Sequence, residues 1–292
     1  MSKTGLIVEG GGMKCAYSAG VLDKFLDNNI EFDYTIGISA GSANAASYLA
    51  GQRGRNLRFY TTHIHDDNYF GLKPFLKTGN IFGLQYIYKT LSNSDGADPL
   101  DYEHIVNNPS EFVIVATNAR TGKPHYFTKD EIQKDNYIQI MASSALPAAC
   151  RTIKIDGEKY FDGGVSDSLP IDKAIEDGCD KIVVISSKPR NFVKTPEKGK
   201  PLYTILCHRY PKIIELLNNR HINYTKAQKK MYDLEKEGKI FVFAPSKNLP
   251  MDTFAMDADK NMDLYKLGLS DFDALKNDLY SFMDLKVQQS AM

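Results

Sequence analysis

The chain of 292 residues has no excess of either charge and no long hydrophobic segment. It carries 36 lysines and arginines against 36 aspartates and glutamates, so its overall charge attracts neither nucleic acid nor an anionic surface. No run approaches the roughly 18 apolar residues that a membrane span requires. The N-terminus has one lysine but neither a long apolar stretch nor a cleavage site, so we expect no secretory signal peptide.

Cysteine is scarce, and its spacing indicates neither a disulfide framework nor a metal site. The four residues are Cys15, Cys150, Cys179 and Cys207. We therefore expect reduced thiols in a cytoplasmic protein. His63 and His65 are spaced like a weak metal pair, but no cysteine or acidic ligand cluster accompanies them. We expect no bound metal and no cofactor.

One short motif, Gly37-Ile38-Ser39-Ala40-Gly41, has the G-x-S-x-G pattern of a nucleophile elbow. Residues 32–36 before it are typical of a short buried strand, and the small residues at 42–50 after it are typical of a closely packed helix. A strand, a sharp turn and a helix form the setting in which this motif exposes a serine hydroxyl. The motif indicates acyl transfer through a serine ester. The alternative is a tight turn with an unreactive serine.

A second glycine-rich segment, Glu9-Gly10-Gly11-Gly12-Met13-Lys14, follows a short apolar strand and precedes residues with helical apolar spacing. The amides of such a loop point at an anion. This could be a dinucleotide phosphate, a free phosphate or the oxyanion of a tetrahedral intermediate. The dinucleotide fingerprint is incomplete, because Cys15 replaces its third small residue and the next strand ends at Ser39. An oxyanion explains both motifs, because consecutive βα turns meet at one edge of a parallel sheet.

The third motif is Tyr160-Phe161-Asp162-Gly163-Gly164. Asp-Gly is a common turn dipeptide, so a plain turn is the simplest interpretation of this motif alone. A serine becomes nucleophilic when a neighbouring base takes its proton. An aspartate can act as that base where burial raises its proton affinity. The aromatic pair before Asp162 provides suitable apolar neighbours.

In this order, the glycine loop, the G-x-S-x-G motif and the D-G-G motif resemble the patatin-like phospholipases. The likeness runs from about residue 5 to about residue 187 and includes the Ala-Ser-Ser-Ala-Leu-Pro segment at 142–147. Residues 47–56 look like a bacterial branch of that family with an additional C-terminal domain. The resemblance implies a lipid acyl hydrolase of the α/β class, with a three-layer αβα sandwich around a mostly parallel sheet.

The resemblance also implies roles for individual residues. Ser39 would be the nucleophile and Asp162 the general base of a dyad without histidine, and the amides of Gly10, Gly11 and Gly12 would form the oxyanion hole. Five further positions match the family motifs: Lys14, Gly37, Gly41, Gly163 and Gly164.

Two positions depart from the family pattern. Glycine is usual at Cys15, and prolines are common at Arg151-Thr152. Cys15 is either a small buried packing residue or a thiol whose pKa is lowered by the helix N-terminus. We expect the packing residue.

The order of elements indicates a catalytic domain and a smaller extension. The β/α alternation is clear to about residue 187, where apolar runs are typical of parallel strands buried on both faces. We predict a catalytic domain over 5–187, a linker over 188–200 and a mainly helical C-terminal domain over 201–292. Residues 56–108 either cover the serine and form an acyl pocket, or pack outside on the helices.

Charge is unevenly distributed in the C-terminal third. Residues 188–239 hold 13 Lys and Arg against 5 Asp and Glu, whereas residues 250–285 hold 8 acids against 3 lysines. Either the basic face docks on anionic lipid, or two solvated helical faces attract each other, and we favour the second. The expected partners are a lipid or other acyl-ester substrate and, peripherally, a membrane, but no nucleic acid. The oligomeric state stays open.

Two rival functions stay open. A Ser–His–Asp esterase also uses the G-x-S-x-G motif, and His208 and His221 follow Asp162 in the order that this class requires. However, Ser39 comes after only one βα unit, which is early for that class. The chain could also be a non-catalytic module that binds acyl chains or a regulator, although the intact Ser39 and Asp162 favour an enzyme.

Overall fold

The computed structural model describes residues 2–285, which form one sheet of eight strands in the order β5-β6-β3-β2-β1-β7-β8, with β4 also paired to β3. Five strands are parallel: β1 (Thr4–Val8), β2 (Tyr34–Ile38), β3 (Glu111–Asn118), β7 (Lys181–Ile185) and β8 (Ile240–Phe243). Three are antiparallel: β4 (Pro124–Thr128), β5 (Ile153–Ile155) and β6 (Glu158–Asp162). The mostly parallel sheet that the sequence predicts is confirmed.

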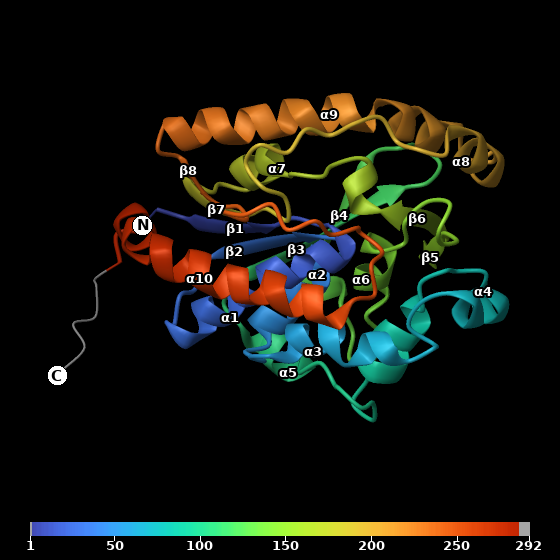
Figure 1. Cartoon of the computed structure of the whole chain (residues 1–292), viewed down its shortest axis with the longest axis horizontal. Coiled ribbons are helices and arrows are strands. Elements are labelled where there is room, and N and C mark those ends of the chain that lie inside the picture. Colours follow the sequence, from blue (N-terminus) through green and yellow to red (C-terminus); the bar gives the residue numbers. More distant parts are fainter. Residues whose placement is uncertain (1, 286–292) are drawn as a thin grey trace.

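Helices cover both faces of this sheet and complete three layers (Figure 1). One face carries α7 (Ile171–Glu176) and the long α9 (Pro211–Lys236). The other carries α1 (Ala16–Asp27), α2 (Ala40–Leu49), α3 (Arg55–Thr61), α5 (Tyr102–Asn107) and α10 (Ala258–Phe282). The remaining helices are α4 (Leu72–Thr78), α6 (Ile138–Ser143) and α8 (Lys200–Leu206). Single turns lie at Gly12–Cys15, His63–His65, Lys129–Glu131 and Gly163–Val165, and a π-helical turn lies at Tyr86–Leu91.

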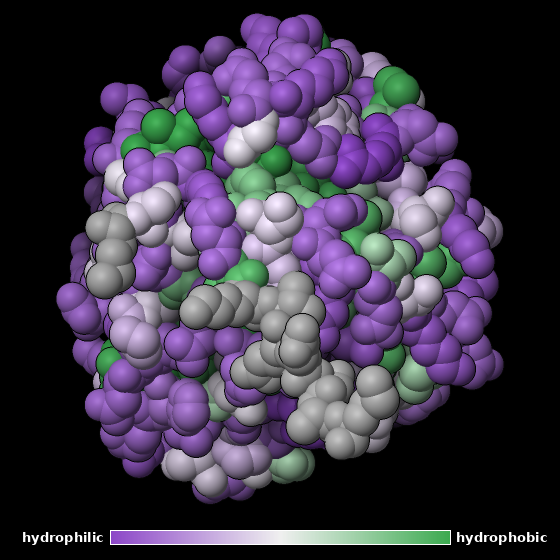
Figure 2. Space-filling view, turned by 90° about the vertical axis from the view of Figure 1, so that its left-hand side faces the viewer, coloured by the Kyte–Doolittle hydropathy of each residue, from purple (hydrophilic) through white to green (hydrophobic). Residues whose placement is uncertain are grey.

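The surface at the amino end of the parallel strands is mostly hydrophilic, with apolar residues visible in several recesses, most clearly near its upper centre (Figure 2). Within residues 2–285, no helix combines the length and the apolar character needed to cross a bilayer.

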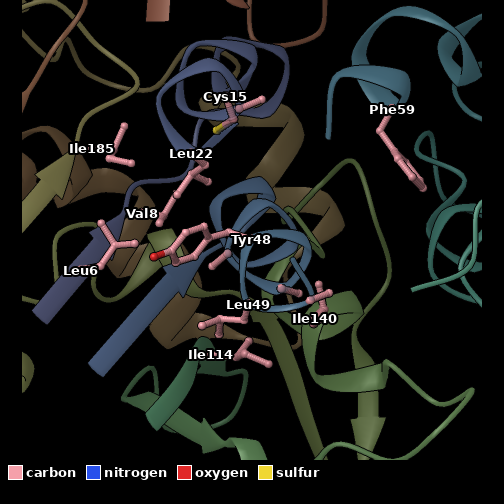
Figure 3. Packing of buried hydrophobic residues seen from close by; sticks show 14 of the residues in the cluster. Leu6, Val8, Cys15, Leu22, Tyr48, Leu49, Phe59, Ile114, Ile140 and Ile185 are labelled. Carbon is pink, nitrogen blue, oxygen red and sulfur yellow. The ribbon is translucent and has the colours of Figure 1, made fainter. Parts of the chain in front are cut away.

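Strand residues alternate between two hydrophobic cores, one on each face of the sheet. Leu6 and Val8 belong to the core beneath α1 and α2, whereas Ile7 between them belongs to the core beneath α7 and α9. All three are fully buried. Figure 3 shows Leu6 and Val8 on the side of the sheet that faces Leu22 of α1 and Tyr48 of α2. Burial on both faces is what the continuous apolar runs predict.

The C-terminal residues are packed into the rest of the molecule. β8 extends the sheet beside β7, and α10 crosses α1 at two glycines. A Cβ on Gly20 would lie 2.2 Å from the carbonyl oxygen of Tyr265, and a Cβ on Gly268 would lie 2.2 Å from that of Tyr17. Only glycine therefore lets the two backbones come this close. A linker at 188–200 stays a prediction, but the parts on either side of it share one sheet.

The two long C-terminal helices do not attract each other across an interface. α9 and α10 lie on opposite faces of the sheet (Figure 1). In the part of the chain that the structure describes, no ion pair joins residues 188–239 to residues 250–285. The interpretation that we favoured for the uneven charge is therefore wrong, because the sheet separates the two helices.

Candidate active site

Ser39 occupies the sharp turn between β2 and α2, as the sequence predicts. Its φ of 55° and ψ of −131° are uncommon for a residue with a side chain, and such backbone strain costs about 1–3 kcal/mol. The two flanking positions must be glycine, because other backbone atoms lie where a Cβ would be. A Cβ on Gly37 would lie 2.4 Å from the Cα of Ser42, and a Cβ on Gly41 would lie 2.2 Å from the carbonyl oxygen of Val8. Both glycines of the motif thus make the strained turn possible.

Strand pairing brings Asp162 close to Ser39. Along one edge of β3, Val115 lies opposite Ile38 of β2, and the next residue, Ala116, lies opposite Asp162 of β6. The other edge of β3 is occupied by β4 at this point. β6 therefore pairs with the same edge of β3 just beyond the point where β2 ends. Its last residue, Asp162, lies next to the turn that holds Ser39.

The side chain of Asp162 is buried in the D-G-G turn, with an exposed fraction of 4%. Its Oδ1 accepts a hydrogen bond from the amide of Gly164 at 2.8 Å. A Cβ on Gly163 would lie 2.2 Å from a carbonyl oxygen of β3, so the turn packs directly on that strand. Burial raises the pKa of Asp162, while hydrogen bonding with Ser39, the charge of Arg220 and the Gly164 amide oppose the rise. A carboxylate with a raised pKa is a stronger base.

The glycine loop lies against Ser39 and leaves its amides free. A Cβ on Gly10 would lie 2.9 Å from the Cβ of Ser39. Within residues 2–285, the amides of Gly10, Gly11 and Gly12 have no hydrogen-bond acceptor, and all three residues line the same cavity as Ser39. The amide of Ser39 is already used, because it donates to the hydroxyl of Ser143 at 2.8 Å. Free amides beside a serine are what an oxyanion hole requires.

A buried ionic network holds this loop from behind. Glu9 is 1% exposed. It pairs with Lys188 and accepts hydrogen bonds from the amide of Ser187 at 2.8 Å and from the hydroxyl of Tyr224 at 2.9 Å. The hydroxyl of Ser187 in turn donates to the carbonyl oxygen of Gly10 at 2.8 Å. Sequence reasoning missed this network, for which an acidic residue at the end of an apolar strand was the one signal.

Ser39 and Asp162 line a cavity of about 510 Å³. A drug-sized molecule or an acyl chain fits a volume of this size. Residues 56–108 contribute eight large apolar or aromatic side chains to it: Phe59, Tyr60, Tyr69, Phe82, Leu84, Ile87, Tyr88 and Leu100. Another part of the cavity lining consists of charged side chains, among them Lys188, Lys194, Glu197, Lys198 and Arg220. Residues 56–108 therefore cover the serine, which was one of the two arrangements expected.

Arg220 of α9 links the Ser39–Asp162 pair to the C-terminal residues. Its Nε donates to the carbonyl oxygen of Gly164 at 3.0 Å, and its Nη1 donates to Glu197 at 3.1 Å. Glu197 also pairs with Lys194 at 2.7 Å. Because the charge of Arg220 opposes the effect of burial on the pKa of Asp162, it helps to set the pH at which Asp162 loses its proton.

We expect Arg220→Gln to move the acidic limb of the pH–rate profile to higher pH. Loss of the positive charge removes one influence that lowers the pKa of Asp162. Arg220→Lys, which keeps a charge but lacks the Nε bond, should shift the limb less. The measurement is kcat/KM for a water-soluble ester across pH, with Arg209→Gln, at an exposed position, as the control. An unshifted limb in Arg220→Gln would show that another group titrates.

Lys14 and Cys15 pack behind the loop and do not line the cavity. The Nζ of Lys14 lies 5.9 Å from the ring centroid of Phe192, and burial together with the charge of Lys188 lowers its pKa. Cys15 is fully buried, and its Sγ donates to the carbonyl oxygen of Glu9 at 3.4 Å. Burial raises the pKa of Cys15 to about 12. The expected packing role therefore fits, and a reactive thiolate does not.

None of the six histidines, all of which the structure describes, lines the cavity. The Nδ1 of the exposed His208 lies 2.9 Å from the carbonyl oxygen of Ile205. His63 pairs with Asp98 at 2.9 Å. Residues 2–285 contain no cluster of side chains that could hold a metal ion. The geometry thus gives Ser39 an aspartate but no histidine as its neighbour.

Comparisons with known proteins identify the family of this chain. A model of the patatin-like phospholipases matches residues 6–175, and a model of a domain of unknown function, DUF6363, matches residues 210–284. The chain is 26% identical over 267 residues to the uncharacterized protein YjjU of Escherichia coli (strain K12), which covers 90% of this chain and 74% of that protein. Among solved structures it is similar to VipD from Legionella pneumophila, with a TM-score of 0.47 and 12% identity, over 95% of this chain and 67% of that one. Because the family model spans more than half of the chain, this protein belongs to the patatin-like phospholipase family.

Proposed function

We propose that this protein is a serine acyl hydrolase that cleaves lipid esters, with Ser39 as the nucleophile and Asp162 as the general base. Membership of the patatin-like phospholipase family supports a lipid hydrolase. One observation carries the finer proposal: Ser39, a buried Asp162 and three free loop amides share a single cavity. A nucleophile, a base and an oxyanion site are the parts that acyl transfer needs.

The reaction would proceed through an acyl-enzyme. Asp162 takes the proton of the Ser39 hydroxyl while the Oγ attacks the ester carbonyl carbon. The tetrahedral intermediate carries its negative charge on the former carbonyl oxygen, which the free amides of the glycine loop stabilise. Collapse breaks the bond to the alcohol, which leaves with the proton from Asp162. Water, activated by the same carboxylate, then releases the acid and restores the serine.

The surroundings of the pair suit this chemistry. Near neutral pH an aspartate is a useful base only where its pKa is raised, and burial provides this at Asp162. An amide donor to an oxyanion contributes roughly 3 kcal/mol to the stability of the transition state. The aromatic and aliphatic lining favours a long acyl chain, because each buried methylene contributes about 0.8 kcal/mol to binding.

The direct test is to incubate the purified protein with a total lipid extract and to analyse the products by mass spectrometry. We expect free fatty acids together with the matching lysolipid or alcohol, in amounts that increase with time. Ser39→Ala protein, prepared in the same way, is the control. If the unaltered protein releases no more acid than this variant does, the proposed function is wrong.

A further inference from the structure

Two short helices carry apolar side chains that the rest of the described chain leaves uncovered. The residues are Leu72, Phe75 and Leu76 on α4 and Leu202, Ile205 and Leu206 on α8, with exposed fractions from 49% to 74%. Each helix is anchored by its opposite side, where Pro74 and Tyr203 are buried. Large apolar side chains gathered on a surface mark an interaction site.

Neither helix lines the cavity that holds Ser39, but residues close to each in the sequence do: Tyr69 and Phe82 on either side of α4, and Lys198 just before α8. Both helices lie at the same end of the molecule, where the parallel strands have their carboxyl ends (Figure 1). One connecting segment, 146–151, contacts the residues that follow each helix. Its Ala149 carbonyl oxygen accepts the amide of Ile81, just after α4, at 2.8 Å, and its Ala148 backbone is hydrogen-bonded to Cys207, just after α8. Leu146 of this segment lines the cavity.

Cations are frequent in and next to the two helices along the sequence. Residues 194–212 contain five lysines and arginines and only one acidic residue, Glu197. α4 itself adds Lys73 and Lys77 and contains no acidic residue, although Lys73 lies 3.9 Å from Asp67, just before the helix. Lys200, the first residue of α8, and Arg209, just beyond its end, are exposed and form no ion pair with any residue between 2 and 285. Unpaired cations next to apolar side chains favour a partner that is apolar in its interior and anionic at its surface.

We propose that the apolar faces of α4 and α8, with the cations around them, dock on an anionic lipid bilayer, so that the cavity opens toward the membrane. This inference rests on the proposed function, because a lipid ester has to leave a bilayer to reach Ser39. Side chains that project from two separate helices can enter an acyl layer, which needs no complementary shape.

The chain contains no tryptophan, so a single introduced tryptophan reports on its own surroundings. In Ser39→Ala protein, which would leave the lipid intact, we expect the emission of Leu76→Trp and of Ile205→Trp to shift to shorter wavelength with vesicles of phosphatidylcholine and phosphatidylglycerol. Ile175→Trp, at an exposed apolar position of α7, is the matched control and should not shift. The proposal is overturned if the emission of neither Leu76→Trp nor Ile205→Trp shifts, or if the emission of Ile175→Trp shifts equally.

The role of the cations is tested by affinity for the same vesicles. Each cation near an anionic leaflet contributes about fivefold to binding at low salt. Lys200→Gln combined with Arg209→Gln should therefore weaken binding about 25-fold, and high salt should weaken binding of the unaltered chain. Hydrolysis of a water-soluble short-chain ester should stay unchanged in this variant. Unchanged affinity would overturn the proposal.

The two proposals fail in different ways. A protein that hydrolyses the soluble ester but binds no vesicles refutes the docking surface alone. A protein that binds vesicles through α4 and α8 but hydrolyses no ester supports the surface and refutes the proposed function. If Leu76→Asp with Ile205→Asp instead converts a dimer into a monomer, as sedimentation would show, the surface belongs to a second copy of the chain and the docking proposal is overturned.

Discussion

Ser39→Ala is expected to lower the turnover of an ester substrate by about 10⁴-fold or more. Ser39 has the hydroxyl that the strained turn between β2 and α2 presents to the cavity, and alanine leaves nothing there to carry an acyl group. The residual rate would come from binding and from the loop amides. The measurement is kcat for a water-soluble ester. Mass spectrometry after fluorophosphonate treatment should place the adduct on the peptide that contains Ser39.

A second serine of the same cavity provides the matched control. The hydroxyl of Ser144 lies 2.9 Å from that of Tyr88, and both residues line the cavity. Ser144 does not lie on the nucleophile turn, so Ser144→Ala should keep turnover within about tenfold. An adduct on Ser144, or a Ser39→Ala protein that keeps most of its activity, would contradict the assignment of the nucleophile.

The turn at Ser39 could be predicted from sequence because its cause is local. Gly37 and Gly41 are required by contacts within a few residues and with the neighbouring strand, and the motif states that requirement directly. The position of the glycine loop beside Ser39 could also be predicted, because the carboxyl ends of adjacent parallel strands meet at one edge of the sheet. Asp162 is different, since its place beside Ser39 results from the antiparallel return of β6 along β3. Only the resemblance to a family connected it with the serine.

The parts that could not be predicted depend on contacts between distant segments. Glu9 has two such partners, Lys188 just after β7 and Tyr224 of α9. Both are far from Glu9 in the sequence, and no spacing connects them with it. The bond from Arg220 to Gly164 likewise requires α9 to lie over the end of β6. The pairing of β8 with β7 could not be predicted either, because a four-residue strand has too little periodicity to indicate which strand it pairs with.

Asp162→Asn is expected to be about as inactive as Ser39→Ala, because an amide cannot take the proton of the serine hydroxyl. Asparagine has nearly the same shape, and its oxygen can still accept the hydrogen bond from the Gly164 amide. In the unaltered protein, activity needs the deprotonated carboxylate. Since burial raises the pKa of Asp162, activity should be lost on acidification at a higher pH than for an exposed aspartate. In a plot of kcat/KM against pH, the residual activity of the variant should lack the acidic limb that protonation of Asp162 causes.

Thermal unfolding separates loss of the base from loss of the fold. Because the pKa of Asp162 is raised, the native protein holds the proton more tightly than the unfolded chain does. The free energy of unfolding therefore falls as pH rises from the unfolded pKa through the native one. Asparagine has no charge to bury, so above this range Asp162→Asn should unfold at a temperature no lower than that of the unaltered protein.

The histidines decide between a dyad and a triad. Single changes to glutamine should each keep turnover within about tenfold, because no histidine lines the cavity. The positions are His63, His65, His104, His125, His208 and His221. If His208→Gln or His221→Gln were as inactive as Ser39→Ala while still folded, a histidine would be the base. The role of Asp162 would then be limited to orienting it.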